Sequence, residues 1–429
     1  MTPNDVTREN AESSMQGPLA EDPGIAEIDR AFAEKFGEAK STAFADAGSV
    51  HHHHHHHRSS GSGRRHRRHH HHHHHKKLTA GRVIFRIFLV LALFMAVIAG
   101  AFYAVSRFGQ KEMKKSEVRA EAEAPVPEIP DVPVAAEEDG TVTYNGEHYR
   151  YNEDLINILI MGVDRKGSME DTEAVVGKSS GQADVLFIAS VNTKTGAVSL
   201  LHISRDTITD VDVLDVEGNY TGTEKMQICL AYSTGDGGPL SCENTVRAVS
   251  RMFYGLPIHA YAAMDLDAIE PINESVDGVT VKVLQDMTDR DPAFVEGAEV
   301  TLHGNQAMKY VRARYYKNES EEVIRESNNK RMERQRQYLT AFLKKATART
   351  KRDLTYPLTL YRVISPFMVT DITPSRLTYL VSLALGGANW NGKITKIPGE
   401  SVRGEKHNEF YVTISEFYPL ILDTFYDKL

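Results

Sequence analysis

The chain holds one long apolar segment near residue 100 and, well after it, shorter apolar runs separated by polar turns. The long segment, Ile87–Val105, contains nineteen residues without a charge. A helix of that length, rising 1.5 Å per residue, roughly spans a hydrocarbon core of about 30 Å. A buried core helix would hardly be apolar all round between an Arg- and His-rich tract and a disordered linker. The segment is apolar all round, and no small-residue cleavage site follows it. It therefore predicts a single transmembrane helix rather than a core helix or a cleaved signal peptide.

The shorter apolar runs predict strands at Ile156–Gly162, Val185–Val191 and Val198–Ser204. Helical patterns follow later in the chain, around residues 241–254, 335–345 and 374–385. Strands and helices mixed in this way indicate an α/β domain with helices on both faces of a sheet.

Composition divides the 429 residues into four parts. Residues 1–82 have too few apolar residues to bury a core and are expected to form a disordered tail. The transmembrane helix is expected at 83–106, and an extended linker, acidic and rich in proline, at 107–142. A folded domain is expected at 143–429.

Charge around the apolar segment predicts its orientation. Nine Lys or Arg lie between Arg58 and Arg86, against five between Arg107 and Arg119. By the positive-inside rule the N-terminus is cytoplasmic and the folded domain lies outside the cell, anchored in the cell membrane by one pass. The basic tract would lie against anionic headgroups, so no nucleic-acid partner is expected.

Two seven-histidine runs, His51–His57 and His69–His75, lie within the expected tail. An expression tag normally lies at a terminus, so we favour a native low-complexity tract. Metal binding by the histidines is the less favoured interpretation.

The chain has two cysteines, Cys229 and Cys242. Their spacing fits no zinc pattern. An extracellular location favours a disulfide that closes a short loop over two unpaired thiols. Spacing alone does not show that the two Cα atoms come within bonding reach.

Charged residues flank the three predicted strands. Asp164 follows the first strand, Asp184 precedes the second, and Arg205 and Asp206 follow the third. A turn joins the second and third strands, which should therefore run antiparallel. If the first strand is also antiparallel to the second, all four residues share one edge of the sheet. Two carboxylates and an arginine there suit a divalent ion facing a phosphate. The alternative is that these residues lie there only because polar residues are common at the ends of strands.

Two further arginine pairs lie later in the chain. Arg312 and Arg314 are two apart and, in an extended segment, point the same way. The segment NNKRMERQRQYL predicts a helix with four polar residues on one face, namely Arg331, Arg334, Gln335 and Tyr338. Guanidinium groups match phosphate oxygens bidentately, so this spacing would build a pyrophosphate clamp. A solvated basic face is the alternative.

The order of these segments resembles a known family. NILIMGVD, ADVLFIASVN, HISRDT, KMQICLAY, MDLDAIEPINESVDGVTV, LHGNQAMKYVRARY and RMERQRQ follow one another as in the LytR-CpsA-Psr domain. The resemblance runs from about Asn157 through Lys345 and continues toward the C-terminus. It implies an α/β/α sandwich with a central mixed sheet and a pocket for a polyprenyl pyrophosphate.

The resemblance also implies an activity: metal-assisted transfer of a glycopolymer from a polyprenyl-pyrophosphate-linked donor to an extracellular acceptor, either peptidoglycan or a surface protein. At the matching positions, Asp164 and Asp184 would hold Mg²⁺ (or Mn²⁺). The pyrophosphate would be gripped by Arg205, Arg312, Arg314, Arg331 and Gln335. Arg205, Arg312 and Arg314 would be catalytic, with Asp206 as a base or a supporting residue.

Some positions depart from the family pattern. Gln182 stands where an arginine is frequent, Asn328 where an aspartate is usual, and Gln227 where an asparagine is usual. The stretch before Arg331 is long, so Arg325 could take the role of Arg331. Two other functions stay open: a non-catalytic regulator or scaffold that binds polyprenyl lipid or cell-wall polymer, and a lipid-pyrophosphate hydrolase.

Overall fold

The computed structural model describes residues 80–120, 126–164, 181–317, 323–325, 328–386, 389–405 and 407–429. The expectations for residues 1–79, including both histidine runs, lie outside these ranges.

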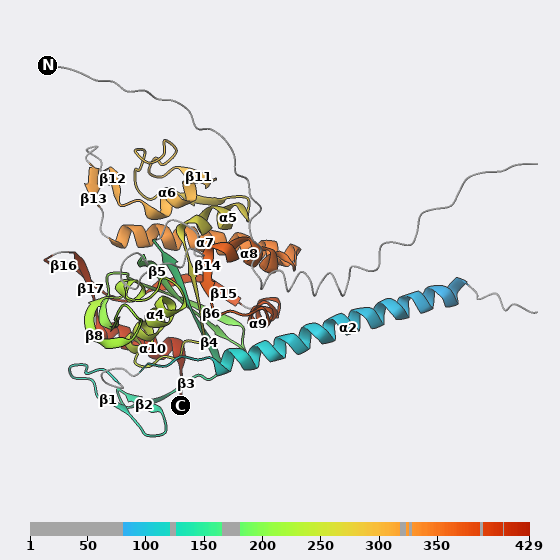
Figure 1. Ribbon diagram of the computed structural model, residues 1–429, viewed down its shortest axis with the longest axis horizontal. Helices are drawn as coiled ribbons and strands as arrows, with labels where there is room; N and C mark the ends of the chain where they lie inside the picture. The colour runs from blue at the N-terminus through green and yellow to red at the C-terminus, as the bar shows by residue number, and fades with distance from the viewer. Residues whose placement is uncertain are drawn as a thin grey trace, which may run out of the picture. The chain divides into compact units, whose positions relative to one another are not determined.

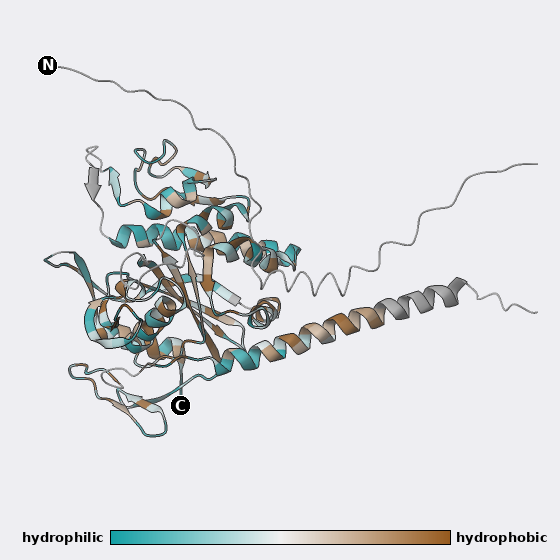
Figure 2. Cartoon of the chain, viewed as in Figure 1, coloured by the Kyte–Doolittle hydropathy of each residue, from teal (hydrophilic) through white to brown (hydrophobic). Residues whose placement is uncertain are grey.

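One long helix, α2 (Ala80–Lys115), leads into the folded domain (Figure 1). Among the described residues, its segment Ala92–Lys115 is the only one long and apolar enough to cross a membrane. Figure 2 shows that the apolar part of α2 gives way to a polar end where the helix reaches the domain. The helix continues ten residues past Val105, so the start of the expected linker is helical.

The second half of the expected linker also belongs to the domain. Strands β1 (Val134–Ala136) and β2 (Thr141–Tyr144) join β3 (Glu147–Tyr151) and the C-terminal strand β18 (Tyr426–Lys428) in one sheet. The β2–β3 turn is Asn145-Gly146, with φ of 49° and 79°. Positive φ at both positions is the two-residue turn that suits the twist of a hairpin.

The central sheet has six strands in the order β14-β9-β4-β5-β6-β15. Strands β4, β5 and β6 are antiparallel, whereas β9 runs parallel to β4 and β15 runs parallel to β6. The predicted α/β class and mixed sheet are confirmed. The strands are β4 (Leu155–Val163), β5 (Ala183–Asn192), β6 (Ala197–Ile203), β9 (Ala260–Met264), β14 (Met368–Thr370) and β15 (Asn389–Lys396).

Side chains that alternate along β4 explain the layers around this sheet. Leu159 and Met161 pack in a core shared with α4 (Pro239–Met252) and α10 (Ile414–Phe425). On the opposite face, Ile158 packs with residues of α2 and of α9 (Pro374–Leu385). Helices therefore cover both faces, as an α/β/α sandwich requires.

A second core lies over one edge of the sheet (Figure 1). It is built by α5 (Ile269–Glu274), β10 (Val279–Lys282), β11 (Glu299–Leu302), α6 (Gln306–Arg312), α7 (Asn328–Arg352) and α8 (Tyr356–Ile364). The remaining elements are β7 (Ile208–Leu214), β8 (Tyr220–Gln227), α3 (Leu230–Ser233), η2 (Leu266–Ala268), β12 (Tyr315–Lys317), β13 (Val323–Arg325), η3 (Ser365–Phe367), β16 (Gly399–Arg403) and β17 (Asn408–Val412).

Helix α2 is fixed to α9 by close packing. The hydroxyls of Ser106 and Ser382 are 2.8 Å apart, and Glu112 accepts a hydrogen bond of 3.1 Å from Thr373. A Cβ atom at Gly109 would collide with the carbonyl oxygen of Ser375. The two helices approach each other closely because this position has no side chain.

We therefore expect Gly109→Val to separate α2 from α9. Overpacking of this kind costs about 1–3 kcal/mol, which should speed amide hydrogen exchange in α9 roughly tenfold. The measurement is hydrogen exchange of the full chain in detergent. Gly100→Val is the matched control, because no atom lies within 4 Å of a Cβ there. Equal exchange in α9 for the two variants would contradict the close contact.

Candidate functional site

The antiparallel arrangement of β4, β5 and β6 brings the flanking polar residues to one edge of the sheet. Asp164 directly follows β4, Asp184 is the second residue of β5, and Arg205 follows β6 by two positions. The pairing of Val163 with Ala183 sets this register. The predicted antiparallel order of the strands is confirmed.

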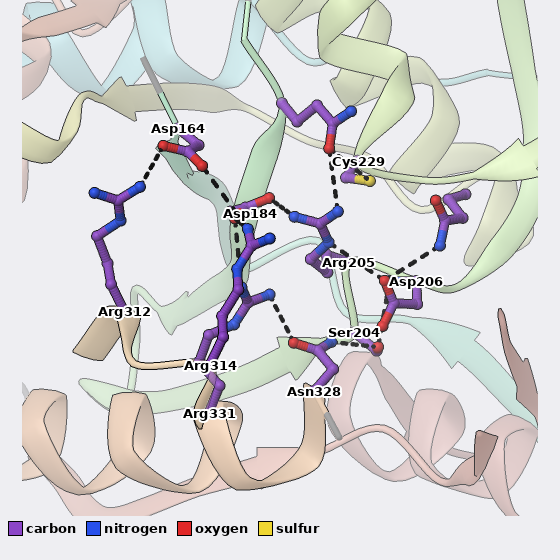
Figure 3. A network of polar contacts seen from close by, with 12 residues as sticks. Asp164, Asp184, Ser204, Arg205, Asp206, Cys229, Arg312, Arg314, Asn328 and Arg331 are labelled. Carbon is purple, nitrogen blue, oxygen red and sulfur yellow. Dashed lines mark hydrogen bonds and ion pairs between the residues drawn. The ribbon is translucent and has the colours of Figure 1, made fainter. Parts of the chain in front are cut away.

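The carboxylate of Asp184 is the centre of the cluster (Figure 3). One oxygen, Oδ1, accepts a hydrogen bond from Nη1 of Arg205. The other oxygen, Oδ2, lies 3.3 Å from Nη2 of Arg314 and 3.5 Å from Nη1 of Arg331. Three guanidinium groups from distant parts of the sequence therefore meet at one carboxylate.

Asp164 holds the remaining arginine of the predicted clamp. Its Oδ1 accepts a hydrogen bond of 2.8 Å from Nη2 of Arg312, and its Oδ2 lies 3.8 Å from Nη2 of Arg314. The prediction that Arg312 lies in an extended segment is wrong, because Arg312 is the last residue of helix α6. The chain turns at Ala313 (φ −50°, ψ 132°), so both arginines still face the sheet edge.

Asp206 lies on the other side of Arg205. Nε of Arg205 donates to its Oδ1 at 3.3 Å, and the amide of Gln227 donates to the same oxygen at 3.2 Å. Burial raises the pKa of Asp206, against the opposing effect of Arg205 and Arg331.

All three departures from the family pattern lie at this cluster. Gln227 donates a hydrogen bond to Asp206, as described above. Gln182 accepts a hydrogen bond of 3.1 Å from Nη2 of Arg205. Asn328 accepts one of 2.7 Å from Arg331 and donates one of 3.2 Å to Ser204. Of Arg325 only the backbone, in β13, is described.

The predicted polar face of α7 is confirmed, and all four of its residues are buried: Arg331, Arg334, Gln335 and Tyr338. Arg334 is fully buried and donates to Gln285 at 2.7 Å and to the carbonyls of Tyr310 and Ala313. Its guanidinium is held by the backbone at the end of α6. The sequence placed Arg334 on the right face but gave no sign of this supporting role.

A cavity of about 660 Å³ opens beside the cluster. Its charged part is lined by Asp184, Arg312, Arg314 and Arg331. Its apolar part is lined by Ile272, Leu339, Phe342, Leu343, Leu360 and Ile364. Gln335 also lines the cavity, and its buried Oε1 has no hydrogen-bond partner in the described part of the chain.

The charges of the cluster favour an anionic ligand. Four guanidinium groups (Arg205, Arg312, Arg314 and Arg331) face three carboxylates, those of Asp164, Asp184 and Asp206. Arg331 is 8% exposed, whereas Arg312 and Arg314 are 38% and 50% exposed. The two more exposed arginines are the ones most accessible to a ligand.

The two carboxylates also fit a small divalent cation. Asp164 and Asp184 both lie within 4 Å of the same nitrogen of Arg314, so a positive charge already lies between them. Mg²⁺ is typically held by one or two carboxylates, with phosphate oxygens and water completing its octahedron. Among the described residues, no group of three or more acidic, His or Cys side chains forms a complete metal site.

The predicted disulfide is wrong. Cys229 and Cys242 are both free and buried. The thiol of Cys229 faces Gln182, with a separation of 4.0 Å between Sγ and Oε1, whereas Cys242 lies on α4 within the main core. Burial raises the pKa of Cys229 to about 11 and also raises that of Cys242.

A charged cluster that opens onto an apolar cavity has the chemistry that suits an amphiphile with an anionic head. The chain belongs to the LytR_cpsA_psr family, whose model matches residues 109–417.

Two similar proteins are named polyisoprenyl-teichoic acid–peptidoglycan teichoic acid transferase TagU. The chain is 27% identical over 239 residues to that of Oceanobacillus iheyensis, covering 55% of this chain and 65% of the relative. It is 28% identical over 264 residues to that of Halalkalibacterium halodurans, covering 62% and 75%. The match thus spans just under two thirds of the first relative. The crystal structure of B. subtilis TagV matches with a TM-score of 0.46 and 22% identity, covering 64% of this chain and 96% of that one.

Arg334→Met should destabilise the fold. It leaves buried acceptors at the end of α6 without their donor, at about 1–3 kcal/mol for each acceptor. The check is thermal unfolding of the full chain in detergent. In the control, Arg349→Met, the arginine lost is half-exposed and pairs with an exposed Asp277 at 3.3 Å, so the effect should stay below about 1 kcal/mol. Similar midpoints for both variants would contradict the supporting role of Arg334.

Both cysteines should remain reduced in the folded protein. Alkylation of the unfolded chain without any reductant should add two groups, as read by intact mass, and prior reduction should not change that number. Alkylation only after reduction would show a disulfide and contradict the structure.

Proposed function

We propose that this protein is a membrane-anchored phosphotransferase. It moves a glycopolymer from a polyprenyl-pyrophosphate carrier to an extracellular acceptor, either peptidoglycan or a surface protein. The observation that carries the proposal is the cavity, which has Arg312, Arg314 and Arg331 of the cluster at one end and an apolar interior at the other. Family membership and the names of the two TagU relatives support the same substrate class.

The two ends of the cavity match the two ends of such a donor. The polyprenyl tail would contact the apolar side chains of α5, α7 and α8, where burial contributes about 25 cal/mol per Å². The pyrophosphate would lie at the sheet edge, where Arg312 and Arg314 exchange a carboxylate for a phosphate oxygen. The buried Oε1 of Gln335, which has no hydrogen-bond partner among the described residues, would accept a hydrogen bond from the donor or from a water beside it.

The transfer follows from this placement. An acceptor hydroxyl attacks the phosphorus that carries the glycan, a new P–O bond forms, and the bond to the lipid phosphate breaks. Asp206, whose pKa is raised by burial, takes the hydroxyl proton. Arg205 and Arg331, both held by Asp184, are aligned in advance to neutralise the charge on the leaving phosphate. Mg²⁺ or Mn²⁺ held by Asp164 and Asp184 would supply further charge neutralisation.

The proposal includes the location of the protein. Helix α2 crosses the cell membrane once, with the basic segment before it in the cytoplasm and the domain outside. This orientation gives the cavity access to extracellular acceptors.

The deciding experiment is an assay on the full chain in detergent with Mg²⁺ and a polyprenyl-pyrophosphoryl oligosaccharide, with peptidoglycan fragments present or absent, read by mass spectrometry. A phosphate-linked glycan that appears only with the fragments supports a transferase. Release of glycan phosphate without transfer would replace the proposal with a hydrolase. Donor that stays bound and unreacted would replace it with a binding protein.

Arg331→Met should lower kcat/KM by about 10²–10³-fold, the typical cost of one donor to a developing negative charge. Lys330→Met is the matched control on the same helix, because Lys330 is exposed and its ammonium lies 3.5 Å from the carboxylate of Glu333. The control should retain wild-type activity. Equal activity of the two variants, each shown to be folded, would remove Arg331 from the clamp.

A further inference from the structure

The geometry points to a second membrane contact. We propose that the exposed side of α8, with the basic end of α7, docks on the outer leaflet of the bilayer that α2 crosses. We call this the α8 surface and define it by Lys351, Arg352, Leu354, Leu358, Arg362 and Val363. Its occupant is the surface of a bilayer that contains anionic lipid. The inference rests on α2 crossing the membrane, which is part of the proposed function, but not on the transfer reaction.

The first step is the level of the membrane relative to the domain. Helices α2 and α9 run antiparallel, because Ser106 contacts Ser382 while Glu112 contacts Thr373. Both helices rise 1.5 Å per residue, so the C-terminal end of α9, at Leu385, lies level with about Tyr103 of α2. Tyr103 lies within the apolar segment, so this end of α9 reaches the depth of the membrane interface.

The second step places α8 on the same side of the domain. The hydroxyl of Tyr361 on α8 donates a hydrogen bond of 3.4 Å to the carbonyl of Ile372, just before α9. Ile372 packs against the cluster that includes Met113 of α2. Figure 1 shows α8 and α9 on the side of the domain from which α2 extends.

The third step is the chemistry of the α8 surface. Leu354 is 59% exposed and Leu358 44%, and Val363 is also exposed. The three side chains lie within ten residues of one another, and an interfacial helix buries such aliphatic groups about 5–10 Å into the headgroup region. Lys351 and Arg352, the exposed residues that end α7, would meet anionic headgroups.

The opposite side of α8 explains why this contact matters. Leu360 and Ile364 line the apolar part of the cavity. Helix α8 therefore separates the cavity from the proposed membrane surface. Docking would bring the apolar end of the cavity to the leaflet that holds a polyprenyl donor, so the tail would not have to cross water.

The test uses the full chain in nanodiscs of phosphatidylcholine and phosphatidylglycerol that also contain a nitroxide-labelled lipid. A fluorophore is attached to a single introduced cysteine in Leu358→Cys, Val97→Cys or Val216→Cys. The native cysteines are buried and have raised pKa values, so they react slowly. Val97 reports on α2, and the exposed Val216, in the turn between β7 and β8, is the control for an aliphatic residue away from the α8 surface.

We expect quenching of the label at position 358 to be at least about twofold stronger than at position 216, as for an interfacial side chain. Quenching at 358 should weaken in discs of phosphatidylcholine alone and in the Lys351→Gln/Arg352→Gln variant. A label at 358 no more quenched than one at 216 would overturn the proposal, and would leave the surface to a protein partner or to water. A label at 97 that is not quenched would instead refute the membrane anchor and with it that part of the proposed function.

Discussion

The site depends on one carboxylate, that of Asp184, which holds three guanidinium groups at once. Arginines brought this close would repel one another, and burying them without a partner would cost several kcal/mol. The negative charge of Asp184 offsets both the repulsion and the cost of burial. It also joins three segments of the chain: the one after β6, the one after α6 and the start of α7. These three contacts hold the cluster together. Only its outer pair, Arg312 and Arg314, is exposed enough to change partner.

Another buried arginine, Arg334, supports the cluster around Asp184. Arg334 binds the backbone where α6 ends, and so fixes the point from which Arg312 and Arg314 project. The same helix, α7, carries Arg331 on its first turn and Phe342 three turns later, the first at the charged end of the cavity and the second at its apolar end. One rigid helix thus sets the distance between the place for an anionic head and the place for an apolar tail.

The apolar helix α2 is part of the fold rather than an attachment to it. Helix α2 continues without a break from its apolar segment into a tight contact with α9, which Gly109 makes possible. In the proposed topology, a domain held in this way turns a fixed face toward the membrane, whereas a domain on an extended linker would not. The exposed aliphatic and basic residues of α7 and α8 would lie on that face, next to the wall of the cavity.

The sequence by itself determined the features that depend on local patterns: the apolar span, the three strands with their flanking Asp164, Asp184 and Arg205, and the polar face of α7. The spacing of apolar residues and the residue types in turns are local features, and the order of the motifs indicated the family. Tertiary structure decided the rest. The β2–β3 hairpin joins the domain by pairing with β18 at the far end of the chain and by packing in the main core. The two cysteines stay apart because α3 and α4 direct them to different surroundings. These outcomes depend on contacts between residues distant in sequence, which no local pattern records.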